Sequence, residues 1–303
     1  MNEGVLRTLL RTVYGIKPYR KTKIKGGTIF VDLRDPRGLS IYKKGVYSPG
    51  SGELLPKLWK AAFNLKPSYF LDIGANYGEI SLTTQYPKSV KNIYLIEPNP
   101  NLLKALAKSV AIHPDFNKIK IVKKAISNRD NQNVELIVPI TSSGLGSIKI
   151  TGLYDNLGNE HFKVRTITID SLLENLESEV AVAKIDVEGA ELDVLKGARK
   201  ILRKNKMLIF LEISSIYLQK LNMSLSKVFK YLNSIGYLYY HDEKRNDFIS
   251  LKNKTYQQVW AIFSKREILS SYYKRDDSVI GDFILFSNNF NEGDIKKYIL
   301  GVR

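Results

Sequence analysis

The chain has 303 residues, of which 44% are hydrophobic and 25% are charged, so a mainly disordered or collagen-like chain is excluded. It contains no cysteine, which excludes disulfide bonds, thiol nucleophiles and thiolate metal sites. Because 47 basic residues stand against 30 acidic ones, the net charge of +17 favours an anionic partner such as nucleic acid, a membrane surface, or a phosphorylated or acidic substrate.

Two features of the chain bear on its location. No run of about 18 apolar residues is present, so the sequence predicts no transmembrane helix. The first residues carry Arg7 and Arg11 within their apolar pattern and lack the continuous apolar stretch of a secretory signal. We therefore expect a cytoplasmic protein, and nothing in the sequence predicts its oligomeric state.

The first 53 residues predict an extension outside the main domain, made of a short helix, a basic connector over 17–25 and a hairpin with strands at 28–33 and 38–42. The connector holds five basic residues and no acid. Either it binds an anionic acceptor, RNA included, or it is a solvated basic segment.

Residues 54–264 alternate short apolar runs with helical periods. The predicted strands are 69–72, 92–97, 119–122, 180–186 and 207–213, and the predicted helices are 99–112, 191–202 and 225–235. Near-continuous apolar strands alternating with helices are typical of a parallel sheet covered on both faces. The sequence therefore predicts a doubly wound, mostly parallel α/β fold.

Three further segments are predicted with less regular patterns. Residues 133–139 and 162–169 would be strands around a loop rich in glycine and serine, and 256–263 would close the far edge of the sheet. Residues 265–303 show no periodicity, and we expect a C-terminal tail or small cap there.

The strongest motif is the run FLDIGANYG over 70–78, in which an apolar strand leads into D-x-G-x-x-x-G and then a predicted helix. Gly74 and Gly78 allow a tight turn and a close approach of the backbone to a ligand. A dinucleotide site would need glycine where Asn76 stands, and the charge of Asp72 would face a pyrophosphate. That acid better suits a ligand with an ammonium and a sulfonium group.

The next predicted strand ends in Glu97, followed by Pro-Asn-Pro. A carboxylate there can accept hydrogen bonds from both hydroxyls of a ribose, which indicates an adenosine-containing ligand at the carboxyl edge of the sheet. The alternative is that Asp72 and Glu97 are ordinary strand ends in solvent.

With these motifs the chain resembles the FkbM family of S-adenosylmethionine-dependent methyltransferases, which have a Rossmann-like fold. The resemblance covers about 45–263 and lies in the blocks 71–78, 96–99 and, above all, 184–191 with 194–198. It implies S-adenosylmethionine as cofactor and methyl transfer to oxygen. The residues expected to bind the cofactor are Glu53, Asp72, Gly74, Asn76, Gly78, Glu97, Asn99, Ala125, Ile126, Ser127 and Asp186. Glu53 fits equally as an acid at a helix start.

The block KIDVEGAE over 184–191 suggests where the acceptor is handled. Lys184, Asp186 and Glu188 would share one side of an extended strand, and Glu212 ends the following strand. Beside the cofactor, these four residues would orient or deprotonate an acceptor hydroxyl. Alternatively they form a structural salt-bridge cluster. A divalent cation held by Asp186, Glu188 and Glu212 is a further alternative.

The sequence thus predicts a methyltransferase that uses S-adenosylmethionine to O-methylate a sugar or another small hydroxylated metabolite. Two alternatives stay open: an RNA-modifying methyltransferase, motivated by the charge, and a non-catalytic cofactor-binding module.

Overall fold

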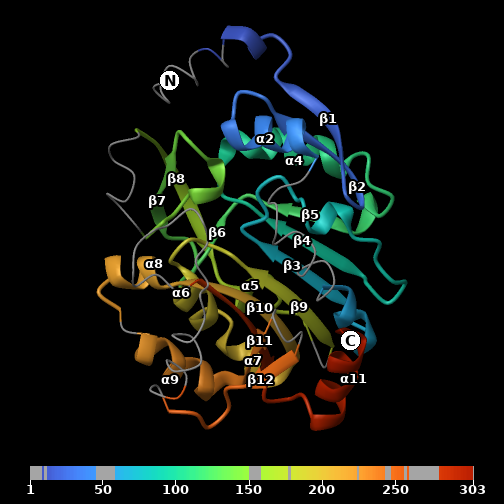
Figure 1. Cartoon of the computed structure of the whole chain (residues 1–303), viewed down its shortest axis with the longest axis vertical. Coiled ribbons are helices and arrows are strands. Elements are labelled where there is room, and N and C mark those ends of the chain that lie inside the picture. Colours follow the sequence, from blue (N-terminus) through green and yellow to red (C-terminus); the bar gives the residue numbers. More distant parts are fainter. Residues whose placement is uncertain are drawn as a thin grey trace.

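The computed structural model describes residues 9, 12–45, 59–149, 158–176, 179–223, 225–242, 247–255, 258 and 280–302. Its centre is an eight-stranded sheet in the order β12-β11-β13-β10-β9-β3-β4-β5 (Figure 1). The parallel part consists of β3 (Tyr69–Ile73), β4 (Asn92–Ile96), β5 (Ile119–Val122), β9 (Val180–Ile185) and β10 (Lys206–Ser214). These are the five strands predicted from the apolar runs, and the predicted fold class is confirmed.

Helices cover both faces of this sheet, which is why its strands are apolar on both sides. One face packs against α4 (Pro100–Val110) and α11 (Glu292–Val302), and the other against α5, α6, α7 and α9. Within β3, Phe70 faces the first core, whereas Leu71 and Ile73 face the second. The helices of the second face are α5 (Ile169–Leu172), α6 (Glu191–Lys196), α7 (Arg199–Lys204) and α9 (Leu225–Ile235); α8 (Ser215–Lys220) follows β10.

The helix predicted over 191–202 is two short helices, α6 and α7. Gly197 lies between them, and a Cβ atom there would overlap the backbone carbonyl oxygen of Ser127. The close approach of these two backbones explains both the glycine and the break.

The expectation of a C-terminal tail or small cap is wrong for residues 280–302. Strand β13 (Ile280–Ser287) lies between β10 and β11 (Gly236–Asp242) and pairs antiparallel with both. It buries Phe283 and Phe286, while Tyr298 of α11 is fully buried. The far edge is β12 (Asp247–Ser250), and residues 256–263 lie outside the described residues apart from residue 258.

The N-terminal extension also differs from its prediction. The basic connector is strand β1 (Tyr19–Ile24), which pairs with β2 (Gly27–Asp32), and the segment expected as a second strand is helix α2 (Pro36–Lys44). Asp35 caps this helix, because its carboxylate accepts hydrogen bonds from the backbone N–H groups of Arg37 and Gly38. Proline in the first turn completes a start signal that outweighs the strand-like alternation.

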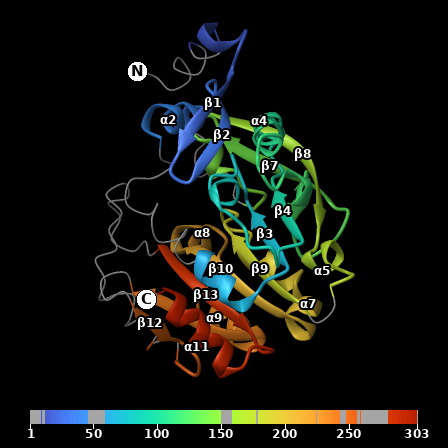
Figure 2. The same cartoon turned by 90° about the vertical axis from the view of Figure 1, so that its right-hand side faces the viewer.

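A second, three-stranded sheet lies beside the main one, in the order β6-β8-β7. It contains β6 (Ala125–Ile126), β7 (Asn133–Pro139) and β8 (Asn159–Ile167), so both predicted strands exist. Short 3-10 turns are found at η1 (Ala62–Leu65), η2 (Ser81–Thr83), η3 (Phe116–Lys118) and η4 (Ser143–Leu145). Figure 2 shows β1, β2 and α2 at one end of the molecule and α11 with β12 at the other. None of the helices in the described ranges is long and apolar enough to span a bilayer.

Candidate functional site

The glycine loop after β3 is held against the ends of two neighbouring strands. The N–H groups of Gly74 and Ala75 donate to the carbonyl oxygen of Ile96, at 3.0 and 3.1 Å. Gly74 has a φ of 81°, and a Cβ atom on it would overlap the carbonyl oxygen of Asp186 beyond β9. Position 74 therefore requires glycine for two reasons: its backbone conformation is left-handed, and there is no room for a Cβ atom.

A strained backbone conformation usually costs about 1–3 kcal/mol, and at position 74 the steric overlap adds to that cost. Replacing Gly74 with alanine should therefore lower the free energy of unfolding by more than strain alone. Gly45→Ala is the matched control. Gly45 also has positive φ, at 65°, but a Cβ atom there would be 3.5 Å from its nearest neighbour. Denaturant unfolding of both variants should show the larger loss at position 74, and equal losses would contradict the close approach of Asp186.

The helix predicted after this loop is a single 3-10 turn, η2. The hydroxyl of Thr83 donates to the carbonyl of Glu79 at 2.6 Å, and that of Thr84 to the carbonyl of Ile80 at 2.8 Å. These hydroxyl bonds occupy carbonyls that a continuing helix would use, and Pro87 follows closely. The anion-favouring helix terminus predicted at this point is absent from the described loop.

Glu97 lies directly after β4, with 6% of its surface exposed. One carboxylate oxygen accepts the N–H of Asn76 and the other accepts the N–H of Asn99, each at 2.8 Å. Burial raises the pKa of Glu97 to about 7, although the two backbone hydrogen bonds oppose the shift. The carboxyl group is thus fixed beside the glycine loop, and each oxygen keeps one further lone pair.

Lys184 joins two acids at the carboxyl edge of the sheet. Its Nζ lies 3.0 Å from Oδ2 of Asp186 and 3.7 Å from Oδ1 of Asp72, which is its neighbour in register on β3. Burial lowers the pKa of Lys184, but the charges of Asp186 and Asp72 outweigh burial and raise it. Asp72 is 2% exposed and also accepts the hydroxyl of Ser81 at 2.8 Å. Because one lysine stands beside two aspartates, the cluster has one negative charge in excess.

Glu188 does not continue the strand side shared by Lys184 and Asp186, which corrects the predicted alternation. Strand β9 ends at Ile185, and Glu188 has a left-handed φ of 51°. Burial and the charge of Asp186 together raise the pKa of the half-buried Glu188 to about 8, although a hydrogen bond with Tyr217 opposes the shift. A carboxyl group with this pKa can exchange a proton near neutral pH.

Glu212 lies on β10, two residues beyond Phe210, whose partner in register is Lys184. Its charge contributes to the raised pKa of Lys184. Within the part of the chain that the structure describes, no three histidine or acidic side chains gather to hold a metal ion. The alternative cation site at Asp186, Glu188 and Glu212 is therefore not formed in the described region.

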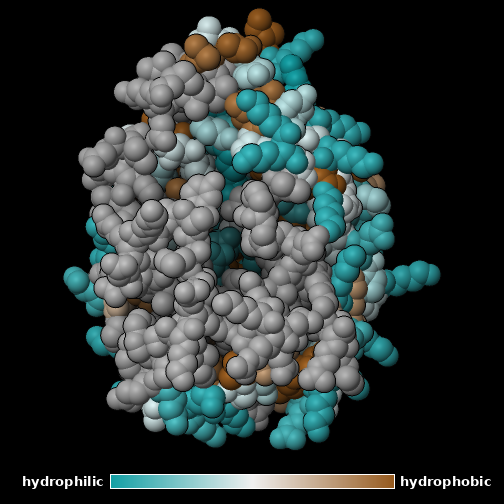
Figure 3. All heavy atoms as spheres, viewed as in Figure 1, coloured by the Kyte–Doolittle hydropathy of each residue, from teal (hydrophilic) through white to brown (hydrophobic). Residues whose placement is uncertain are grey.

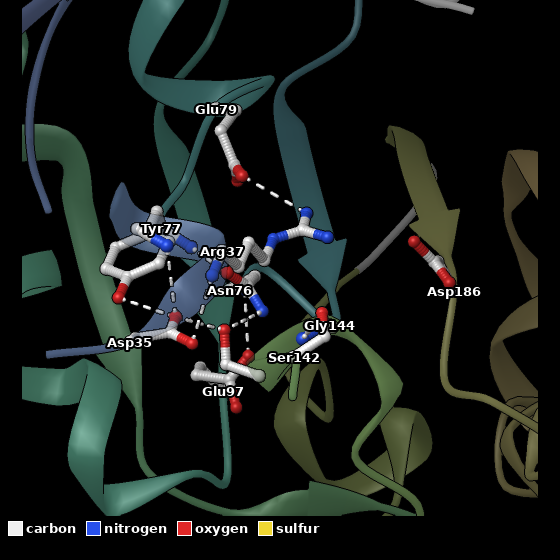
Figure 4. Close-up of polar contacts among 12 residues, drawn as sticks. Asp35, Arg37, Asn76, Tyr77, Glu79, Glu97, Ser142, Gly144 and Asp186 are labelled. Atoms are coloured by element: carbon white, nitrogen blue, oxygen red, sulfur yellow. Dashed lines mark hydrogen bonds and ion pairs between the residues drawn. The ribbon is translucent and has the colours of Figure 1, made fainter. Parts of the chain in front are cut away.

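The N-terminal extension supplies site contacts that the sequence did not indicate (Figure 4). Oδ2 of Asp35 accepts the hydroxyl of Tyr77 at 2.8 Å and the hydroxyl of Ser143 at 2.6 Å. Arg37 pairs with Glu79 at 3.1 Å, and both side chains are largely buried. Asp35 thus ties the glycine loop to the loop around η4, closing one side of the site.

The remaining predicted site residues have separate positions. Ala125, Ile126 and Ser127 are buried after the end of β5, and Asn99 caps α4 by accepting the N–H of Asn101. Glu53 lies outside the described residues. Figure 3 shows the molecule hollowed on the face seen in Figure 1, with hydrophilic residues at the bottom of the hollow.

Comparisons with known proteins identify the family. Residues 72–239, more than half of the chain, match the methyltransferase FkbM domain. No curated protein gives a significant match.

Several solved structures are similar in part. A methyltransferase FkbM from Methylobacillus flagellatus KT is 21% identical, with a TM-score of 0.32 over 48% of this chain and 33% of that chain. A precorrin-6y C5,15-methyltransferase from Geobacter metallireducens GS-15 is 12% identical, with a TM-score of 0.34 over 75% and 87% of the two chains. A SAM-dependent O-methyltransferase from Thermotoga maritima is 8% identical, with a TM-score of 0.33 over 90% and 86%. This chain thus spans about a third of the first of these proteins. The domain match shows that the chain belongs to the FkbM methyltransferase family.

Proposed function

We propose that the protein is an S-adenosylmethionine-dependent methyltransferase that methylates a hydroxyl oxygen of a sugar or another small hydroxylated metabolite. The observation that carries the proposal is the buried Glu97 carboxyl group, fixed by Asn76 and Asn99 beside a loop whose Gly74 admits no side chain. An adenosine ligand would find a ribose acceptor and a close backbone approach at one place.

The described residues fit the cofactor at three points. The free lone pairs of Glu97 would accept the ribose hydroxyls, and residues 125–127 would lie along the adenine. The cluster of Asp72, Lys184 and Asp186 has one more negative than positive charge. This excess suits a ligand whose amino-acid end carries an ammonium group and whose sulfur is a sulfonium. When bound, S-adenosylmethionine supplies an electrophilic methyl group.

The acceptor would be bound by side chains on β9 and β10 and in the loop after β9. The acceptor hydroxyl would be positioned by Asp186, Glu188, Lys184 and Glu212. A carboxylate among them would take its proton as the oxygen forms its bond to the methyl carbon and the bond from sulfur to that carbon breaks, which would leave S-adenosylhomocysteine. Family membership supports methyl transfer, and the resemblance to O-methylating members favours oxygen over nitrogen.

The first test is the thermal stability of the full chain with S-adenosylmethionine, S-adenosylhomocysteine or NAD. We expect the first two to raise the melting temperature and NAD to leave it unchanged. Stabilisation by NAD alone would refute the proposed cofactor. A panel of sugars and small polyols with methyl-labelled cofactor then identifies the acceptor, and binding without any transfer would indicate a non-catalytic module.

Glu97→Ala should weaken binding of S-adenosylhomocysteine by roughly 1.5–3 kcal/mol, the scale for hydrogen bonds to a charged group. Calorimetry with adenosine and 2′-deoxyadenosine separates the ribose contact from a folding defect. The wild-type protein should prefer adenosine, and the variant should bind the two nucleosides equally. A preference retained by the folded variant would place the ribose elsewhere.

A further inference from the structure

One end of the molecule combines exposed aliphatic side chains with exposed lysines. Val13 is 63% and Ile16 is 95% exposed, and Leu9, four residues before Val13, is 52% exposed. Lys17 and strand β1 follow directly in the chain. Figures 1 and 2 both place the helical residues 12–14, β1 and α4 at this end.

The lysines form two rows on the same side of this end. Lys21 and Lys23 are exposed on one face of β1, while Thr22 and Ile24 between and after them are buried on the other. Residues two apart on a strand share a face, so Tyr19 lies in the same row.

Helix α4 adds the second row of lysines. The Nζ atoms of Lys104 and Lys108 lie 5.4 and 6.0 Å from the ring centroid of Tyr19, which brings both lysines to the side of the first row. The acid opposite Tyr19 is Asp32, which is 5% exposed and paired with Arg34 at 2.6 Å. The positive charge of this side is therefore not offset by Asp32.

We propose that this basic-aliphatic surface, made of Val13, Ile16, Lys21, Lys23, Lys104 and Lys108, docks the protein on an anionic lipid bilayer. The lysines would contact lipid phosphates, and the aliphatic side chains would enter the interfacial layer. A nucleic acid would engage the lysines as well, but it offers no apolar environment for Val13 and Ile16. The aliphatic side chains therefore favour lipid over nucleic acid, and so few of them give reversible binding.

Vesicle sedimentation of the full chain tests the proposal. We expect binding to phosphatidylcholine vesicles that contain phosphatidylglycerol, weaker binding in high salt, and little binding to phosphatidylcholine alone. Equal binding to both vesicles, or binding to neither, would overturn the proposal. So would binding of short single-stranded RNA without vesicle binding, which would assign the surface to nucleic acid.

Two double variants locate the surface. Lys21→Ala with Lys23→Ala should lower the partition coefficient about 25-fold, because each basic residue near an anionic membrane contributes about fivefold. Val13→Ser with Ile16→Ser should lower it roughly tenfold.

The control is Lys200→Ala with Lys204→Ala, which removes two exposed lysines of α7 at the opposite end of the molecule. It should change binding less than twofold, roughly the effect of net charge alone. If the control loses as much binding as the β1 variant, the docking surface does not lie at β1. Melting temperatures of all variants show that each is folded.

Discussion

Replacing Lys184 with methionine is expected to lower the free energy of unfolding by about 3–5 kcal/mol. The lysine offsets Asp72, which is 2% exposed and whose Oδ1 lies 3.7 Å from Nζ. Methionine keeps the length of the side chain but leaves this carboxylate buried with Ser81 as its hydrogen-bond donor. The destabilisation would come from an uncompensated buried charge rather than from lost packing.

Two comparisons isolate the charge. Adding Asp72→Asn to Lys184→Met should recover at least half of the lost stability, because the buried charge is removed with its partner. Lys91→Met is the control: Lys91 pairs with Glu179 at 2.8 Å, but its side chain is 60% exposed, so the loss should stay below about 1 kcal/mol. Equal losses in chemical denaturation at positions 184 and 91 would show that the Lys184 cluster is solvated.

The parallel core was predictable because each of its strands is recognisable from its own consecutive residues. A strand covered on both faces is apolar throughout, and five such runs between helical periods define the sheet. The glycine loop was predictable for a similar reason. Only glycine readily adopts a backbone with positive φ, so the glycines of the motif indicate where such a turn lies. The φ of 81° at Gly74 agrees with that interpretation.

Strand β13 was missed because Gly281 and Asp282 interrupt its apolar run, so that neither a strand nor a helix period is visible. Its place is decided by the antiparallel partners β10 and β11, which lie at a distance in the sequence. Sequence pattern cannot reveal such a pairing when the local signal is broken.

The Asp35 contacts were missed for a different reason. The hydrogen bond from Ser143 to Asp35 joins residues 108 positions apart, and the Asp-Pro pair by itself indicates a turn or a helix start. No local pattern predicts which loop a cap residue will also contact. The alternation assumed for Glu188 failed because the strand ends three residues before it.

The rate of methyl transfer should rise with pH and level off above about pH 8 if Glu188 takes the proton of the acceptor. Burial and the charge of Asp186 raise the pKa of Glu188 to about 8. Below that pH, Glu188 is protonated in most molecules and cannot act as a base there. The rate should then fall about tenfold for each pH unit below 8. The acceptor for this assay is the one identified with methyl-labelled cofactor.

Glu188→Gln should lower the rate a hundredfold or more and remove the pH dependence, while binding of S-adenosylhomocysteine and the melting temperature change little. Asp186→Asn should move the midpoint to lower pH, because it removes a charge that raises the pKa of Glu188. Asp193→Asn is the control, since Asp193 on α6 pairs with Lys149, and its replacement should leave the midpoint in place. A midpoint still near pH 8 in Glu188→Gln would assign the proton transfer to another group. A variant that is destabilised yet fully active would instead give Glu188 a structural role.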